Sequence, residues 1–426
     1  MSAHSNKNET MSLGHVNELL RTLSKKTHAA FREQNFKEAQ HLLHDVLKIA
    51  PYQKTAWMDL ASATLRLGEH ELAYEYSLKC IHFMGNDVDP NVYDGLAEIC
   101  HELGKTDEQI YYGRLAISLK KQSVVHESQW AFPSDFPAPF NPHNPQENII
   151  SYSLFGNLPR YGETAILNMQ LAKEIYPEWT CRFYVDESVP PSVLQRLEQH
   201  GAQIVQVNEQ QKQMSGLYWR FFVMDDPTVK RFLIRDADSF LSYRERAAVD
   251  EWLNSSYWFH KMHDGYSHTE LILAGMWGGC TGVFKGLHAN IDAFIATGRY
   301  TNPRVMDQHY LRYCIWPTLK NSVLIHDRYA YNSHALAFPA HQRYASYEHD
   351  PKFHVGANEA SAIIHIHFEH QLSERIVLFV KDQADQTICC YELKSDFKPQ
   401  LDLQLPQYYA EKIKNDEWYI TTQPKI

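Results

Sequence analysis

The sequence lacks any apolar run of the length that crosses a membrane, and its first ten residues are polar. We therefore expect neither a membrane-spanning helix nor a signal segment. The seven cysteines include no Cys-x-x-Cys spacing, and the adjacent Cys389 and Cys390 are poorly placed to pair with each other. These absences together predict a cytoplasmic protein with reduced, buried thiols.

Positive charge is also scarce: 41 Lys and Arg stand against 51 Asp and Glu, which leaves a formal net charge of -10. No cluster of basic residues stands out from this background, so we expect no nucleic-acid partner. The P-loop, GxGxxG, GxSxG and HExxH motifs are all missing from the sequence. Apolar residues make up 44% of the 426 residues, which is enough to build the cores of two domains.

Similar residues recur at a fixed spacing in the first part of the chain. Ala39 lies in a predicted helix over Phe36–Ile49, and Ala73 lies 34 residues later in a predicted helix over 71–81. Gln109 follows Ala73 after a further 36 residues. This pattern resembles the tetratricopeptide repeat, a helix–turn–helix unit, in three copies. The resemblance implies a concave surface for a protein partner, an acceptor or self-association.

Residues 123–147 contain five prolines between Pro133 and Pro145. Such a density excludes a helix or a central strand. An extended free linker is one interpretation. The aromatic residues Trp130, Phe132 and Phe140 favour a linker that packs on a domain surface.

Strand and helix patterns alternate from residue 148 onward. We expect strands at 148–154, 181–185, 203–207 and 231–234, with helices at 163–176 and 191–201. This alternation predicts a parallel sheet with helices on both faces. Ligands of such sheets bind beyond the carboxyl ends of the strands. Ser242 and Glu245 form a capping box that predicts the start of a further helix.

The sharpest chemical feature is the segment Arg235-Asp236-Ala237-Asp238-Ser239, directly after an apolar strand. Two carboxylates separated by one residue can meet one divalent cation. Mg²⁺ and Mn²⁺ prefer oxygen ligands and leave coordination positions open for phosphate. An ordinary polar turn after a strand is the alternative. By the alternation of a strand, the Arg235 side chain should point away from that of Asp236, so we expect it to support the structure rather than contact a ligand.

The order of five motifs over residues 148–360 resembles the glycosyltransferases of the GT-A fold. The order is closest to the retaining branch that includes glycogenin and bacterial lipopolysaccharide galactosyltransferases. The stretch 231–279 also resembles bacterial glycosyltransferase-like proteins with an RDADS motif. In chain order the motifs are Ser153-Leu154-Phe155-Gly156, Asp236-Ala237-Asp238, Leu273-Ala274-Gly275-Met276-Trp277-Gly278-Gly279, Asp307-Gln308-His309-Tyr310-Leu311 and His354-Val355-Gly356.

This resemblance implies a metal-dependent site that uses Mn²⁺ or Mg²⁺. The implied metal ligands are Asp236, Asp238 and His354, and the implied catalytic residues are Asp307 and Gln308. The lysine and aromatic residue that usually follow the HxG motif are absent here. The implied donor-binding residues are Ser153, Phe155, Gly156, Arg220, Asp236, Trp277, Gly278 and Gly356.

Several of these residues have a simpler interpretation beside the functional one. Arg220 could contact phosphate through its guanidinium or could form a surface salt bridge. Asp307 could face the acceptor or could cap a helix. Trp277 could provide a platform for a sugar ring or could be a buried tryptophan.

Two histidine groups are further metal candidates. His365, His367 and Glu369 alternate along one strand face, where they could bind zinc, although a polar strand face is the simpler interpretation. His326 is an alternative to His354 as the late metal ligand of the implied site.

The predicted fold class is α/β: an all-α repeat domain at 15–122, a linker at 123–147, a mixed α/β domain of GT-A type at 148–370 and an extension at 371–426. The predicted function is transfer of a sugar from a nucleotide-sugar donor, with UDP favoured, to a glycan, lipid-linked or protein acceptor. The alternative is a non-catalytic interaction protein with a degenerate transferase domain. A nucleotidyltransferase ranks last, because 157–160 offers only one basic residue, Arg160.

Overall fold

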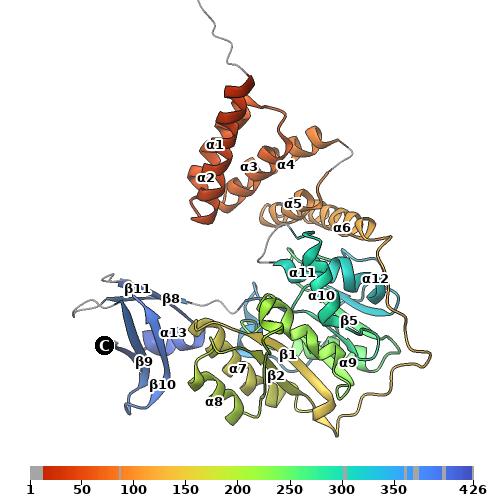
Figure 1. Ribbon diagram of the computed structural model, residues 1–426, viewed down its shortest axis with the longest axis vertical. Coiled ribbons are helices and arrows are strands. Elements are labelled where there is room, and N and C mark those ends of the chain that lie inside the picture. Colours follow the sequence, from red (N-terminus) through yellow and green to blue (C-terminus); the bar gives the residue numbers. More distant parts are fainter. Residues whose placement is uncertain are drawn as a thin grey trace, which may run out of the picture. The chain divides into compact units, whose positions relative to one another are not determined.

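The chain folds into two compact units, Met1–Gln122 and Ser123–Ile426 (Figure 1). The first is helical and the second contains a mainly parallel sheet, which confirms the predicted α/β class. No helix within the described ranges is long and apolar enough to span a bilayer. The computed structural model describes residues 13–85, 88–300, 305–358, 362–367, 374–395 and 400–424.

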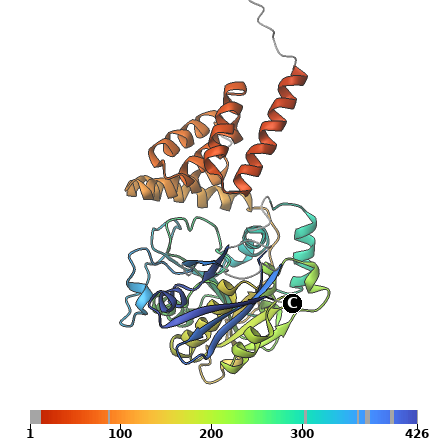
Figure 2. The same ribbon diagram turned by 90° about the vertical axis from the view of Figure 1, so that its left-hand side faces the viewer.

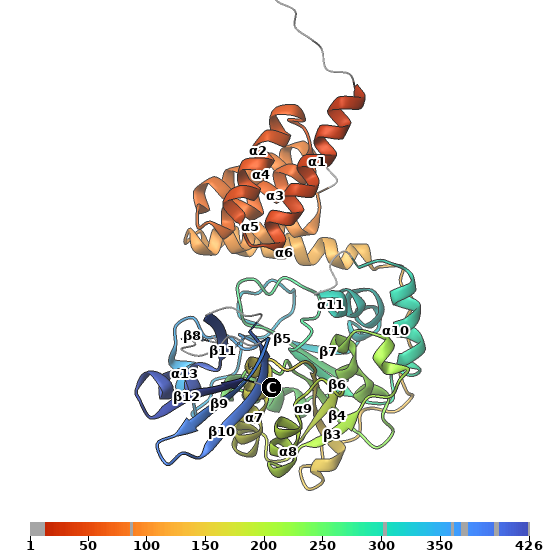
Figure 3. The same ribbon diagram turned by 60° about the vertical axis from the view of Figure 1, so that its left-hand side comes forward.

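The first unit is a stack of helices in which neighbours along the chain pack on one another (Figure 3). The residues at the repeated positions, Ala39, Ala73 and Gln109, are all buried, and the two alanines let the helices approach closely. Gly68 and Gly104 follow two of the helices with positive φ, the backbone that ends a helix most easily. The helices are α1 (Leu13–Arg32), α2 (Phe36–Ile49), α3 (Lys54–Arg66), α4 (His70–Met84), α5 (Pro90–Glu102) and α6 (Thr106–Ser123).

The proline-rich segment before the sheet lies packed on the second unit. The backbone N–H of Trp130 donates to Thr318 Oγ1 at 2.9 Å. The ring of Phe132 packs edge-on against Phe259 at 6.1 Å, and Phe140 stacks on Trp179 at 5.6 Å. The prediction of a packed linker is therefore confirmed at these aromatic residues.

The central sheet has the strand order β3-β2-β1-β4-β6-β5-β7. Every strand runs parallel to the others except β6, which is antiparallel to both of its neighbours. The predicted parallel sheet is therefore present, with β6 as a reversed strand that the sequence pattern did not indicate. The strands are β1 (Asn148–Leu154), β2 (Thr180–Val185), β3 (Gln203–Gln206), β4 (Arg231–Ile234), β5 (Phe259–His263), β6 (Trp277–Cys280) and β7 (Val323–Asp327).

Two glycines allow the reversed strand β6 to fit between β4 and β5. A Cβ added to Gly278 would lie 2.5 Å from the carbonyl oxygen of Phe232. A Cβ added to Gly279 would lie 2.3 Å from the ring of Phe259. Because real Cβ atoms do not approach so closely, these positions require glycine for packing inside the sheet.

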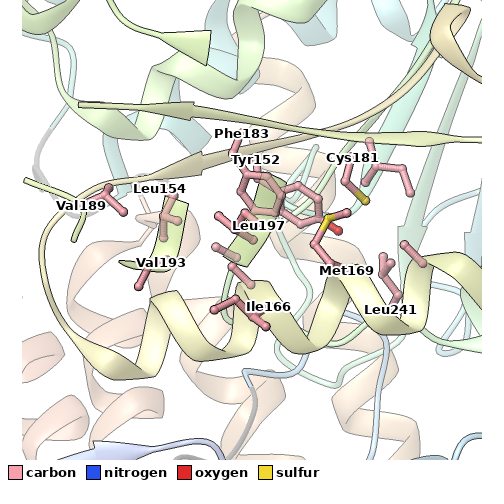
Figure 4. Packing of buried hydrophobic residues seen from close by; sticks show 14 of the residues in the cluster. Tyr152, Leu154, Ile166, Met169, Cys181, Phe183, Val189, Val193, Leu197 and Leu241 are labelled. Atoms are coloured by element: carbon pink, nitrogen blue, oxygen red, sulfur yellow. The ribbon is translucent and has the colours of Figure 1, made fainter. Parts of the chain in front are cut away.

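Helices α7 (Pro159–Ile175), α8 (Pro191–Gln199) and α9 (Tyr243–Leu253) enclose the main core against the sheet. Figure 4 shows Ile166 and Met169 of α7 pointing toward Tyr152 and Phe183, whose rings stack at 4.7 Å. The sheet is further accompanied by the 3-10 segment η3 (Gly216–Asp225) and by α10 (Leu287–Ala296), α11 (Met306–Tyr310) and α12 (Trp316–Leu319).

The predicted cap of α9 is present and also fixes Arg235. Ser242 Oγ accepts the N–H of Glu245 at 3.1 Å, as expected for a capping box. The buried Glu245 carboxylate accepts from Arg235 Nε at 3.0 Å and from the hydroxyl of Tyr176 at 3.0 Å. Arg235 therefore points toward α9, which confirms the prediction that it supports the structure.

The C-terminal strands also belong to the second unit (Figure 2). The elements are β8 (Ala362–His367) paired with β11 (Gln400–Leu405), the three-stranded sheet of β9 (Arg375–Asp382), β10 (Thr387–Lys394) and β12 (Trp418–Pro424), and helix α13 (Gln407–Lys414). Strand β10 and helix α13 contact α7 at Glu163, whose buried carboxylate accepts from the hydroxyls of Tyr391 at 2.6 Å and Tyr409 at 2.8 Å. The same carboxylate pairs with Arg196 of α8 at 2.8 Å.

The proposed zinc face on β8 is only partly described. His365 and His367 are both exposed, and His365 Nδ1 lies 2.7 Å from a carboxylate oxygen of Asp402 on β11. Glu369, the third residue of that group, lies outside the described residues. The described part fits the simpler interpretation of a polar strand face.

We expect Gly278→Ala to lower the free energy of unfolding of the second unit by roughly 2 kcal/mol, because the new methyl group meets backbone atoms that cannot move away. Urea unfolding followed by fluorescence measures this loss. Gly95→Ala is the control, since nothing lies within 4 Å of a Cβ at this position in α5. That change should instead stabilise its helix slightly. Equal stability of Gly278→Ala and the natural chain would contradict this role of the glycine.

Candidate functional site

The sheet topology gathers polar residues at one edge. Because the other strands are parallel, the carboxyl ends of β1, β4, β5 and β7 lie together there. Phe155 follows β1, Asp236 lies two residues after β4, Asp264 directly follows β5 and Asp327 is the last residue of β7. The reversed strand β6 begins at the same edge with Trp277. A ligand of this sheet is therefore expected to bind at this edge.

A buried arginine lies at the centre of this edge. Arg220, from η3, donates through Nη1 to Asp236 Oδ1 and through Nη2 to Asp307 Oδ2 at 2.7 Å. Only 5% of the Arg220 side chain is exposed, and the same fraction holds for Asp307. The interpretation of Arg220 as a surface salt bridge is therefore wrong, because the pair is internal.

The backbone of Arg220 is fixed to β1 by two serines. Ser153 Oγ accepts the N–H of Arg220 at 2.9 Å, and Ser151 Oγ donates to its carbonyl oxygen at 2.7 Å. A guanidinium held at both its backbone and its head group loses little further entropy when it binds carboxylates. Ser153 thus supports Arg220 in addition to lining the pocket described next.

Asp236 and Asp238 both line a pocket of about 200 Å³. Asp238 is paired with Arg160, whose Nη2 lies 2.8 Å from Asp238 Oδ2. Phe155 is 40% exposed and lies edge-on to Trp219. The structure thus brings five of the predicted residues together at one pocket, whose lining is Ser153, Leu154, Phe155, Tyr161, Leu217, Arg220, Asp236, Ala237 and Asp238.

Burial shifts the ionisation of the carboxylates around this pocket. Burial raises the pKa of Asp307, and the nearby Arg220 only partly offsets that rise. Burial and the neighbouring Asp236 raise the pKa of Asp238, against the opposing effect of Arg160. Burial would lower the pKa of Arg220, but the two carboxylates raise it. The site therefore holds its negative charges close together and depends on the two arginines to do so.

Two predicted glycine segments approach the Asp-x-Asp loop. A Cβ added to Gly275 would lie 2.0 Å from Asp236 Oδ2, so this glycine leaves the room that the carboxylate occupies. The carbonyl oxygen of Gly356 accepts from Ser239 Oγ at 3.3 Å, and Asn358 forms a bridge with Ser239. The HxG segment therefore lies against the loop that carries Asp236 and Asp238.

The structure corrects the predicted role of Trp277 and Gly278 as donor-binding residues. Trp277 is fully buried, edge-on to Phe232 at 5.4 Å, and offers no face to a sugar ring. Gly278 faces the Phe232 backbone inside the sheet. Both belong to β6, a strand that the sequence pattern did not predict.

The remaining predicted residues are not among those that line the pocket. Asp307 does not cap α11, whose N-cap is Val305, but accepts the N–H of Gln308 at 2.9 Å within the first turn. The ring of His354 lies edge-on to His268 at 4.8 Å. Gly156 has a positive φ of 79° directly after Phe155. In the part of the chain that the structure describes, no three His, Cys, Asp or Glu side chains gather closely enough to hold a metal ion together.

Sequence reasoning missed Asp264 and underrated Arg160. The buried Asp264 accepts from Arg244 Nη1 and from the backbone N–H of Val355, both at 2.8 Å, so it holds the HxG segment in place. Its signal was an acid directly after a buried strand. The signal for Arg160 was that it is the single basic residue in the first positions after β1, from 155 to 160.

His326, the alternative metal ligand, is engaged elsewhere. Its Nδ1 lies 2.9 Å from Nε2 of His260, and its Nε2 lies 2.9 Å from Glu251 Oε2. Both rings are buried in the sheet, and burial lowers the pKa of each. Their hydrogen bonds account for His326 without a metal.

No family model and no curated protein matches the chain. Among solved structures, the tetratricopeptide repeat domain of Arabidopsis OM64 is 19% identical and covers 25% of this chain and 87% of its own, with a TM-score of 0.24. PcrH from Pseudomonas aeruginosa is 16% identical over 27% of this chain and 83% of its own, with a TM-score of 0.23. A mutant of the Thermobaculum terrenum O-GlcNAc transferase is 14% identical over 48% of this chain and 44% of its own, with a TM-score of 0.25. Likeness at this level carries no functional conclusion.

We expect Arg220→Met to destabilise the second unit by about 3 kcal/mol, because it leaves the Asp307 carboxylate buried without its counter-charge. The double variant Arg220→Met with Asp307→Asn should recover part of that loss, since the buried charge is then gone. Urea unfolding of the natural chain, both single variants and the double variant measures the coupling. Strictly additive losses would contradict the ion pair.

The buried His260 should make stability depend on pH. Below about pH 6.5 the unfolded chain takes up a proton on this histidine that the folded chain resists, so stability falls as the pH is lowered. When the pH is lowered from 7 to 5, we expect the free energy of unfolding to fall by about 2 kcal/mol less in His260→Phe than in the natural chain. Urea unfolding at both pH values measures the difference, and the exposed His349→Phe serves as the control. The same pH dependence in His260→Phe and the natural chain would contradict this assignment.

Proposed function

We propose that the second unit is a nucleotide-sugar-dependent glycosyltransferase of the GT-A type. The observation that carries this proposal is the position of Asp236 and Asp238. They line one pocket together with Ser153 and Phe155, at the neighbouring carboxyl ends of β4 and β1. Ligands of open α/β sheets bind at this edge. The order of motifs along the chain, which resembles that of GT-A transferases, supports the same reaction class.

The donor diphosphate would lie at the acidic pair, with the nucleoside toward Phe155 and Gly156. Asp236 and Asp238 offer the carboxylate oxygens that Mn²⁺ or Mg²⁺ prefers, and Gly275 leaves the room that the Asp236 carboxylate occupies. His354 is proposed as a further ligand from the resemblance alone. When bound, the cation stabilises the negative charge that develops on the departing diphosphate.

The residues of the chain would orient this chemistry. Arg220 holds the Asp236 carboxylate toward the pocket and is itself held by Asp307. We therefore propose that Asp307 is a positioning residue that acts through Arg220, and that Gln308 lies on the sugar side. The acceptor hydroxyl would then bond to the anomeric carbon as the bond from that carbon to the diphosphate oxygen breaks, and its proton would pass to the released diphosphate.

The first unit would bring a partner or acceptor to the enzyme. Stacked helical repeats present an extended surface suited to a polypeptide, which supports a protein partner, a protein acceptor or self-association. Glycan and lipid-linked acceptors are the other proposed classes. All seven cysteines are free, which supports a reducing, cytoplasmic location.

A second candidate function is a non-catalytic interaction protein. The observation that favours it is that each acid of the pair already carries an arginine, Arg220 on Asp236 and Arg160 on Asp238. A degenerate site of this kind would bind no nucleotide in a cation-dependent way.

Thermal unfolding with UDP, GDP or CMP, each with and without Mn²⁺, tests the proposal. A ligand that binds only the folded state raises the melting temperature by mass action. We expect UDP with Mn²⁺ to raise it in the natural chain, because the cation and the diphosphate share the acidic pair. Asp238→Asn should lose the shift while keeping the melting temperature of its ligand-free form within a few degrees.

Asp250→Asn is the matched control, because Asp250 lies on the surface of α9 and pairs with Arg246. It should keep the full shift. If GDP or CMP raises the melting temperature instead of UDP, the donor carries a different base and the proposed reaction class stays the same. If no nucleotide shifts the natural chain, the non-catalytic alternative replaces the transferase.

A further inference from the structure

Arg160 and Arg220 neutralise the same acidic pair but are held very differently. Arg220 has 5% of its side chain exposed and is tied to two carboxylates and to β1. Arg160 has 20% of its side chain exposed and, within the part of the chain that the structure describes, forms a single ion pair, with Asp238. The Nε atoms of both arginines are buried without a hydrogen-bond partner in the described residues, so the difference lies in their head groups and exposure. Arg220 is therefore a fixed part of the site, whereas Arg160 can leave at a lower cost.

The position of Arg160 conflicts with full access of a cation to Asp238. Its Nη2 lies 2.8 Å from Oδ2, the distance of a charge-assisted hydrogen bond. The positive charge of this guanidinium repels a cation that approaches the same carboxylate oxygen. With 12% of its side chain exposed, Asp238 has little surface left for another ligand. A cation that binds Asp238 must compete with Arg160.

Once released from Asp238, the Arg160 side chain could contact a ligand in the pocket. It is the second residue of α7, directly after the loop that leads from β1, and the next residue, Tyr161, lines the pocket. The guanidinium carbon lies 5.3 Å from the centre of the Tyr161 ring. A guanidinium next to a residue that lines the pocket is suited to bidentate contact with the phosphate oxygens of a bound diphosphate.

We propose that Arg160 is an internal counter-ion that competes with the divalent cation for Asp238 and transfers to the donor diphosphate when both ligands bind. The proposal rests on the transferase function. It makes cation binding weak in the empty site and strong in the presence of a nucleotide, so that the two ligands bind cooperatively. A merely structural Arg160 would weaken or leave unchanged the binding of both ligands when it is replaced.

Titration of Mn²⁺ alone, followed by the electron paramagnetic resonance of the free ion, tests the competition without a nucleotide. We expect Arg160→Met to bind Mn²⁺ about tenfold more tightly than the natural chain, since the competing charge is gone. In the presence of saturating Mn²⁺, the same variant should bind UDP about tenfold more weakly, because a phosphate contact is lost. The opposite signs of the two changes distinguish competition from damage to the site.

Three further proteins control the experiment. Arg182→Met removes an arginine that lies 2.6 Å from Asp226 elsewhere in the unit, and it should change neither affinity. Arg160→Lys keeps a positive charge and should stay close to the natural chain for Mn²⁺. Arg160→Met combined with Asp238→Asn should lose the gain in Mn²⁺ affinity, because Asp238 is the ligand that the variant exposes. Thermal unfolding of each verifies that it is folded.

An unchanged or lower Mn²⁺ affinity in folded Arg160→Met would overturn the proposal, as would a gain that survives Asp238→Asn. Tighter Mn²⁺ binding together with weaker UDP binding would establish it. If UDP binds no form of the protein while Mn²⁺ binding still tightens in Arg160→Met, the competition stands and the transferase function fails. The two hypotheses therefore fail by different results.

Discussion

The second unit depends on one buried guanidinium. Arg220 joins the loop after β4 through Asp236, helix α11 through Asp307 and strand β1 through Ser151 and Ser153. Two carboxylates can stay close in a buried site only because this charge lies between them. The position of the Asp236 carboxylate at the pocket is therefore set by Arg220.

The reversed strand β6 is the second constraint on the site. It places the turn before Trp277 at the same edge as the Asp-x-Asp loop, so that Gly275 can lie directly against Asp236. The strand fits between β4 and β5 because Gly278 and Gly279 have no side chains. Two of the three glycines in the segment 273–279, Gly278 and Gly279, therefore serve the packing of the sheet. The third, Gly275, lies against Asp236 of the pocket.

Sequence patterns predicted the parts of the fold that depend on local signals. The strands β1 and β4 were predicted with their observed bounds, and Ser242 caps α9 as its spacing with Glu245 indicated. Strand β6 was missed because Trp-Gly-Gly-Cys shows no alternation of apolar and polar residues. The pair of Arg160 with Asp238 was missed because the two residues are 78 positions apart, and no periodicity encodes such a contact. The predicted donor-binding role of Trp277 was wrong for the same reason, because its burial depends on strands that are distant in sequence.

The buried Glu163 has a consequence for the order in which the chain can fold. Two of the hydroxyls that it accepts from, on Tyr391 and Tyr409, lie 228 and 246 residues further along the chain. Contacts of such long range form late, because loop closure opposes them. During synthesis the helical repeats can fold as soon as they are complete, whereas helix α7 keeps an incompletely satisfied charge until its last partners emerge. Because α7 also carries Tyr161, which lines the pocket, this wall of the pocket gains its last support only after Tyr409 has been made.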